Sequence, residues 1–170
     1  DGLGSGVKAN ILSTLTSKIL CTMAATGINI DECVETLIQT LPVCQVRGVA
    51  YSTFSLIHVN NEGKGFLYEF DNPQAIYYHK GKCIDFEREK LEIYEKPVYK
   101  SELNLEENDV IMVMSGGTIH AGIGQILNFG WERRQIMDYL DRNIKSTMSA
   151  RAVACILTSA CNDLYLDKPG

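Results

Sequence analysis

The sequence has no long hydrophobic run. Its longest wholly apolar stretches, such as VIMVM at Val110–Met114, are far below the roughly 18 residues that a membrane-spanning helix needs. The N-terminus also lacks the basic stretch followed by apolar residues that marks a secretory signal. We therefore expect a cytoplasmic protein with no membrane partner.

Clustered positive charge is missing as well. The 16 Lys and Arg residues are scattered and are outnumbered by 21 Asp and Glu, which gives a net charge of -5. Binding to nucleic acid depends on clustered Lys and Arg that neutralise phosphates, so we expect no nucleic-acid partner. An acidic balance fits metal ions or basic partners slightly better.

Four familiar site motifs are absent. There is no CxxC pair and no Cys/His ligand spacing among the six cysteines at positions 21, 33, 44, 83, 155 and 161. Several of these cysteines lie in apolar helical patterns, so we expect reduced thiols in the core. GxGxxG and GxxxxGK[ST] are also absent, which makes a nucleotide-binding or oxidoreductase domain the least favoured interpretation.

The residues that are present indicate one domain of mixed secondary structure. With 170 residues and 45% hydrophobic content, the chain is long enough for a sizeable core. Apolar residues recur at helical spacing over 5–23, and Asp31 can cap a second helix over 31–41. β-Branched and aromatic runs then predict strands between 49 and 86, with a tight hairpin at Lys80 and Gly81.

The second half of the chain completes this pattern. The stretch 85–109 is dense in Glu and Lys and reads as an exposed strand or sheet edge. DVIMVM, at 109–114, predicts a buried strand, and 131–144 and 150–166 predict helices. Helices, then consecutive strands, then helices predict an α+β domain in which antiparallel sheet is covered by helical layers.

Two glycine-rich stretches are candidate sites. DGLGSG, at 1–6, opens a helix, and a carboxylate at its first position would suit Mg²⁺ or Mn²⁺ bridging to a phosphate group; it could equally be a turn that caps the helix. MSGGTIHAGIGQ, at 114–125, follows the buried strand, a common place for ligands but also an ordinary strand end. Ser115 has no evident base, and His120 reads as a structural histidine.

Five stretches together resemble a known family. DGLGSGVKA before a long helix, STFSLIHV, EFDNP, VIMVMSGGTIHAG and NFGW are similar, in this order, to the metal-dependent serine/threonine protein phosphatases of type 2C, in the bacterial branch typified by stage II sporulation protein E. The resemblance implies a four-layer α-β-β-α sandwich of two antiparallel sheets flanked by helices. It also implies hydrolysis of phosphoserine or phosphothreonine by a water that bridges two Mn²⁺ or Mg²⁺ ions, with no covalent intermediate.

The same resemblance implies the site residues. Asp1 would be the catalytic residue that bridges both ions, and the carbonyl of Gly2 would complete one shell. Gly116 stands where the family has an Asp ligand, and Gly4, Ser115 and Gly117 would belong to the loops around the phosphate. Glycine has no side-chain oxygen, so one metal site loses a charged ligand.

The chain also departs from the family pattern at its ends. It stops at Gly170, before a further acidic pair, and starts at Asp1, without upstream strands. We therefore expect residues 1–170 to be a single phosphatase-like domain that lacks the N-terminal strands and the C-terminal acidic motif and strand.

Two functions follow as expectations. The first is metal-dependent dephosphorylation of a phosphorylated protein, for instance an anti-sigma factor antagonist, with the activity of this chain impaired by Gly116. The alternative is a catalytically inactive phosphatase-like module that binds a phosphoprotein or a regulatory partner.

Overall fold

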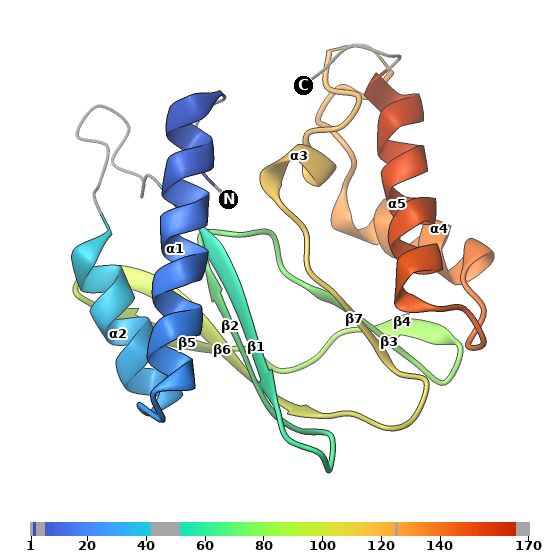
Figure 1. Cartoon of the computed structure of the whole chain (residues 1–170). Helices are drawn as coiled ribbons and strands as arrows, with labels where there is room; N and C mark the ends of the chain where they lie inside the picture. The colour runs from blue at the N-terminus through green and yellow to red at the C-terminus, as the bar shows by residue number, and fades with distance from the viewer. Residues whose placement is uncertain (1, 3–5, 42–51, 125, 166–170) are drawn as a thin grey trace. The chain divides into compact units, whose positions relative to one another are not determined.

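The computed structural model describes residues 2, 6–41, 52–124 and 126–165 (Figure 1). The described residues form two compact units. Unit 1 is drawn from Asp1–Asn72 and Glu87–Asn104, and unit 2 from Pro73–Phe86 and Leu105–Gly170. Each unit therefore combines two separate stretches of the sequence.

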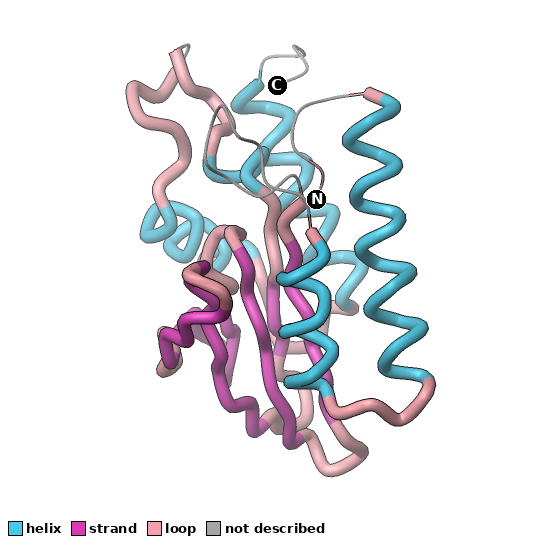
Figure 2. The backbone as a smooth tube through the Cα atoms, turned by 90° about the vertical axis from the view of Figure 1, so that its left-hand side faces the viewer, coloured by secondary structure: helices cyan, strands magenta, loops and turns pink. Residues whose placement is uncertain are grey.

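Unit 1 pairs two helices with a four-stranded sheet. The helices are α1 (Val7–Ala25) and α2 (Ile30–Thr40), which run side by side in opposite directions (Figure 2). The sheet has the order β1-β2-β6-β5 and every neighbouring pair is antiparallel. Its strands are β1 (Phe54–Val59), β2 (Lys64–Phe70), β5 (Glu89–Ile93) and β6 (Lys96–Asn104).

The core of unit 1 lies between α2 and one face of this sheet. α2 buries one stripe of its surface, made of Cys33, Val34, Leu37 and Ile38. Tyr68 and Phe70 of β2 belong to the same core. Residues three to four positions apart share one helix face, so the spacing of the buried residues explains why this stripe faces the sheet.

Polar contacts fasten the start of α2. The Tyr68 hydroxyl (2.6 Å) and the Lys100 ammonium (2.9 Å) both donate to Asp31 Oδ1. Both hydrogen bonds lower the pKa of the Asp31 carboxyl, and the one from Tyr68 has the larger effect. The N-cap is Asn29, whose side chain accepts from the Asp31 amide, so the expectation that Asp31 caps the helix is wrong. Asp31 instead joins the helix to the sheet.

One further expectation for unit 1 needs correction. The charged stretch 85–109 does contain the edge strand β5, but β6 lies between β2 and β5 and buries Val98 and Leu103. These two side chains are an odd number of positions apart, so they lie on opposite faces of the sheet. The stretch therefore lacks the simple apolar alternation of a strand with one buried face. In α1 the apolar spacing correctly predicts a helix, yet Ile11 and Leu15 are exposed.

Unit 2 pairs three helices with a three-stranded antiparallel sheet of order β4-β3-β7. Its strands are β3 (Ile76–His79), β4 (Lys82–Ile84) and β7 (Val110–Met112), and its helices are α3 (Gly116–Ile119), α4 (Arg133–Asn143) and α5 (Ala150–Tyr165). The β3–β4 hairpin turns at Lys80 (φ 47°) and Gly81 (φ 89°). Positive φ at both residues is typical of a two-residue hairpin turn and confirms the predicted tight turn.

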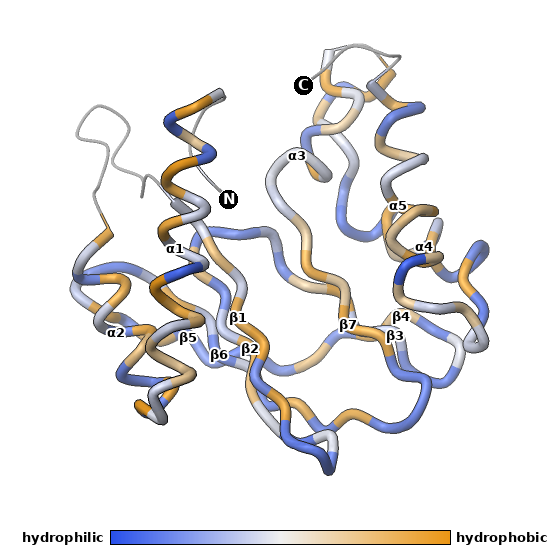
Figure 3. The backbone as a smooth tube through the Cα atoms, viewed as in Figure 1, coloured by the Kyte–Doolittle hydropathy of each residue, from blue (hydrophilic) through white to orange (hydrophobic). Residues whose placement is uncertain are grey.

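The core of unit 2 includes Tyr78, Met112, Trp131, Ile136 and Leu140. Hydrophobic residues follow one another along β7 (Figure 3). Trp131 packs edge-on against Tyr139, with 5.4 Å between the ring centroids. The protein has one tryptophan, so its fluorescence reports on this core.

The fold class is therefore α+β with two antiparallel sheets and helices, as expected. That residues 1–170 form one phosphatase-like domain stays a prediction. None of the five described cysteines is in a disulfide, but only Cys33 is buried, and Cys21 and Cys155 are exposed. The expectation of core thiols is thus wrong for those two. Within the described part of the chain, no helix has the length and apolar character to cross a membrane.

Candidate functional site

The predicted site residues fall into three groups. Ser115, Gly116 and Gly117 lie together in unit 2, where Ser115 is the N-cap of α3 and the two glycines open this helix. Gly2 belongs to unit 1. Asp1 and Gly4 lie outside the described residues, so their roles stay predictions.

The stretch after β7 is one helical turn rather than an open loop. The amide of Thr118 donates to the Ser115 carbonyl (3.1 Å), and the amide of His120 donates to the Gly116 carbonyl (3.0 Å). The Tyr165 hydroxyl donates to the Gly117 carbonyl (2.6 Å). Backbone and side-chain donors therefore hold the segment that contains the predicted ligand position.

His120 contributes a second hydrogen bond to this turn. Its Nδ1 lies 2.7 Å from the Gly116 carbonyl oxygen, which can only accept, so Nδ1 carries the proton. His120 is exposed and bonds back to its own helical turn. This is the structural role that the sequence predicted for it.

Position 116 has room for a side chain. A Cβ built on Gly116 lies 3.6 Å from His120 Nδ1 and 3.7 Å from Cε1, which is ordinary van der Waals contact. Gly116 is also absent from the described glycines with positive φ. Neither the backbone conformation nor the packing around a Cβ therefore demands glycine here.

Gly2 is different, because the fold requires glycine there. A Cβ on Gly2 would overlap the backbone carbonyl of Ala9 in α1. Gly2 also forms an isolated antiparallel bridge with Ser52. The absence of a side chain lets this strand segment approach the helix closely. The predicted ligand at Gly2 is its backbone carbonyl, which any residue would supply, so packing explains the glycine.

The described residues do not by themselves form a metal centre. No group of three or more His, Cys, Asp or Glu side chains among them is placed to hold a metal ion. A two-metal site needs surrounding carboxylates to balance its charge. At the predicted position in α3, Gly116 offers no side-chain oxygen, so the residues present do not fit a pair of divalent ions as they stand.

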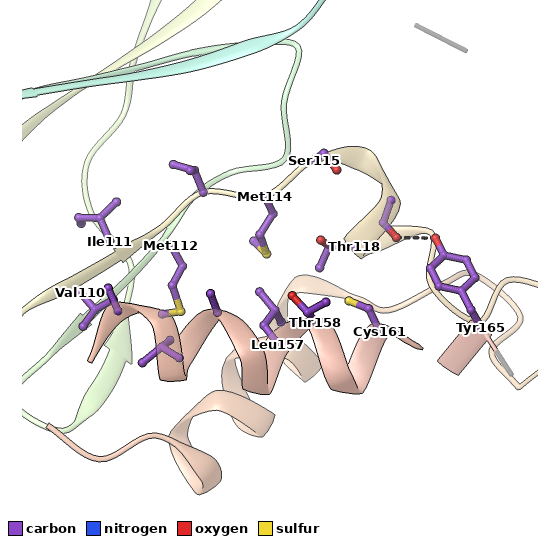
Figure 4. Close-up of a pocket in the computed structure, with 15 residues that line it drawn as sticks. Val110, Ile111, Met112, Met114, Ser115, Thr118, Leu157, Thr158, Cys161 and Tyr165 are labelled. Atoms are coloured by element: carbon purple, nitrogen blue, oxygen red, sulfur yellow. Dashed lines mark hydrogen bonds between the residues drawn. The ribbon is translucent and has the colours of Figure 1, made fainter. Parts of the chain in front are cut away.

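A mostly apolar cavity of about 440 Å³ lies beside α3 in unit 2. Figure 4 shows Met112, Met114 and Thr118 facing Leu157 and Cys161 of α5 across it. Burial raises the pKa of the Cys161 thiol, and a hydrogen bond with Thr118 offsets part of this rise. The cavity therefore holds a neutral thiol and no charged group among its described lining residues. The sequence does not reveal this cavity, because the cavity depends on which face of α5 lies toward β7.

A second polar cluster centres on Asp109, whose side chain is 3% exposed. The carboxylate accepts from the Tyr77 hydroxyl, from His79 Nδ1 at 2.8 Å and from the amide of Glu106 at 2.7 Å. Burial alone would raise the pKa of the Asp109 carboxyl. The hydrogen bonds outweigh burial and lower the pKa, and the one from Tyr77 contributes most among them. The cluster ties β3 to the turn before β7 and lies outside the residues predicted for catalysis.

Similarity to known proteins covers almost the whole chain. The model of the family described as stage II sporulation protein E (SpoIIE) matches residues 1–166. The structure of the phosphatase domain of the cell fate determinant SpoIIE from Bacillus subtilis, in a crystal form without domain swapping, matches with a TM-score of 0.67 and 17% identity, over 99% of this chain and 71% of that one. A Mn-presoaked structure of that domain matches with a TM-score of 0.55 and 15% identity, over 98% and 72%. Comparison with curated proteins gives no match. At these identities, the structural likeness shows the fold.

Proposed function

Because the chain belongs to the stage II sporulation protein E family, we propose that it is a phosphatase domain for phosphoserine or phosphothreonine on a protein substrate, with its activity impaired at Gly116. Phosphatase function at the family level is supported by the match over residues 1–166 and by the shared fold. The specificity for serine and threonine, the metal and the impairment are our proposals. The substrate that we propose is a phosphorylated protein, for instance an anti-sigma factor antagonist in the cytoplasm.

Position 116 carries the proposal of impairment. The backbone conformation and the space around a Cβ allow a side chain there. The fold therefore does not explain why the chain has glycine. The consequence of that glycine is chemical, since a carboxylate is replaced by hydrogen at a place where the resemblance implies a metal ligand.

Mn²⁺ or Mg²⁺ is the cofactor that we propose. A related phosphatase domain was studied after presoaking with Mn, and divalent ions of this kind prefer oxygen ligands. Asp1 and the Gly2 carbonyl are the proposed ligands from the N-terminal loop. The described residues do not fit such a pair of ions as long as position 116 has no side chain.

A second function is favoured by the same glycine. A module that binds a phosphoprotein or a regulatory partner needs no complete metal centre, and Gly116 removes one charged ligand without disturbing the turn around it. The two functions differ in their need for metal, because binding alone would proceed in a chelator.

The test compares the native full-length protein with its Gly116→Asp variant in hydrolysis of para-nitrophenyl phosphate with Mn²⁺. Gly116→Asn is the matched control, since it adds a side chain of the same shape without charge. A bound divalent ion contributes several kcal/mol of transition-state stabilisation, so we expect Gly116→Asp, which restores one charged ligand of that ion, to raise kcat/KM by at least about 100-fold. Gly116→Asn should gain much less.

Three other outcomes are informative, and each would contradict one part of the proposal. Equal turnover by the native chain and Gly116→Asp would mean that another ligand substitutes and that the assignment at 116 is wrong. No turnover by either folded protein would reject the phosphatase and favour the binding module. Equal gains with Asp and Asn would attribute the effect to shape rather than to a metal ligand.

A further inference from the structure

The chain between α3 and α4 carries three exposed hydrophobic side chains. Ile123 is 45% exposed, Ile126 53% and Phe129 86%. We call these three residues the apolar loop surface. Phe129 is the most exposed large hydrophobic residue among those described. Single exposed apolar residues are ordinary, but several on one short segment mark an interaction surface.

Hydrogen bonds fix this segment at both ends. The amides of Ile126 (3.2 Å) and Leu127 (3.0 Å) donate to the Gly122 carbonyl, and the amide of Trp131 donates to the Ile119 carbonyl (2.9 Å). Leu127 packs against the core of unit 2. The chain is therefore anchored on both sides of Phe129 while Phe129 itself stays outside the core.

The backbone conformation of this anchored segment requires glycine at position 130. It adopts φ +85°, and a Cβ there would overlap the carbonyl of Ile119 and approach Ile123. Only glycine combines this backbone conformation with such a close approach. Gly130 thus lets the chain turn sharply between Phe129, which points away from the core, and Trp131, which is buried in it.

A cavity of about 390 Å³ adjoins Phe129 and extends to α3. Its lining includes Phe129, Trp131 and Met114, and also His120, whose Nδ1 holds the carbonyl of Gly116. The cavity and the predicted ligand position are therefore next to each other. Its volume lies within the range of about 300 to 1,000 Å³ that is usual for binding pockets.

We propose that the apolar loop surface and this cavity bind the apolar residues that flank the phosphorylated residue of a protein substrate. The proposal rests on the phosphatase function proposed above, which would place the phosphorylated residue at position 116. The occupant is a phosphoprotein because the cavity beside Phe129 adjoins that position: His120, which lines the cavity, is hydrogen-bonded to the Gly116 carbonyl through Nδ1. An aromatic side chain has only two torsions to fix on binding, and aromatic residues are enriched in protein interfaces.

The test separates protein substrates from small ones. Hydrolysis of phosphocasein and of para-nitrophenyl phosphate is measured for Phe129→Ala in the Gly116→Asp chain with Mn²⁺. An anchor residue contributes more than about 1.4 kcal/mol to binding, so the ratio of kcat/KM for phosphocasein to that for the aryl phosphate should fall about tenfold. The fall should come from KM, and Phe129→Leu should restore part of it.

Ile84→Ala is the matched control, because Ile84 is another exposed hydrophobic residue of unit 2, on β4, outside the apolar loop surface. It should leave the ratio unchanged. An unchanged ratio in Phe129→Ala, with the aryl phosphate still hydrolysed, overturns this inference alone. No hydrolysis of the aryl phosphate by any folded form rejects the proposed function, and the inference with it. Loss of a dimer in sedimentation, without a change in the ratio, would mean that a second copy covers the surface.

Discussion

Replacing Asp109 by asparagine should destabilise unit 2 strongly. The buried carboxylate accepts hydrogen bonds from Tyr77, His79 and the amide of Glu106. Asparagine keeps one acceptor oxygen and turns an NH₂ group toward one of these three donors. A hydrogen bond to a charged group contributes about 1.5 to 3 kcal/mol, and the remaining bonds lose their charge. Together these losses predict about 2 to 4 kcal/mol.

Thermal unfolding followed by Trp131 fluorescence measures this effect, because Trp131 lies in the core of the same unit. For a unit of fewer than 100 residues, 1 kcal/mol shifts Tm by about 4 to 8 °C. Asp109→Asn should therefore lower Tm by at least about 8 °C at pH 7. Asp138→Asn, an exposed position on α4, is the control and should change Tm little.

The difference between the two proteins should depend on pH. The folded pKa of Asp109 lies below its ordinary value, so the unfolded chain takes up the proton first as pH falls. The stability that the charged form provides is complete above the unfolded pKa of about 3.9 and is lost as pH falls through the folded value. The gap in Tm between Asp109→Asn and the native chain should therefore shrink below about pH 4. A gap under 3 °C at pH 7, or one of constant size down to pH 3, would refute the reasoning.

Two further substitutions test the packing of each unit. Leu37→Ala removes a fully buried side chain from the core of unit 1 and should cost about 2 to 5 kcal/mol, measured by far-UV circular dichroism in urea; a cost below 1 kcal/mol would place Leu37 outside a packed core. Gly130→Ala should lower the Tm from Trp131 fluorescence more than Gly124→Ala, because both glycines have positive φ but only Gly130 would place a Cβ on the Ile119 carbonyl; equal shifts would mean that φ alone matters.

Local patterns in the sequence were sufficient for much of the secondary structure. Helical spacing predicted α1, and Lys80-Gly81 predicted a turn that does have two positive φ values. These features depend on residues close together in the chain. The sequence pattern did not predict the place of β6 in the sheet, because strand pairing decides that place. β6 lies between β2 and β5, and its Lys and Glu content does not reveal this.

The sequence singled out the glycines at 116 and 117, and the structure places them in a helical turn. Their role in a site stays a prediction. The cavity beside Phe129 was missed because NFGW was noted only as part of the family resemblance, and exposure of a phenylalanine follows from the backbone around Gly130. The Asp109 cluster was missed for a similar reason, since Tyr77 and His79 approach it through the pairing of β3 with β7.

The division of the sequence between the units has a consequence for biosynthesis. The described chain passes between the units three times, after Asn72, after Phe86 and after Asn104. As the polypeptide leaves the ribosome, the β3–β4 hairpin of unit 2 is therefore complete before β6 of unit 1 has appeared, while β7, which pairs with β3, emerges only after β6. Unit 1 must therefore complete its sheet while unit 2 is still unfinished. A single protease cut at any of the three passages would leave the two units joined by two further peptide connections.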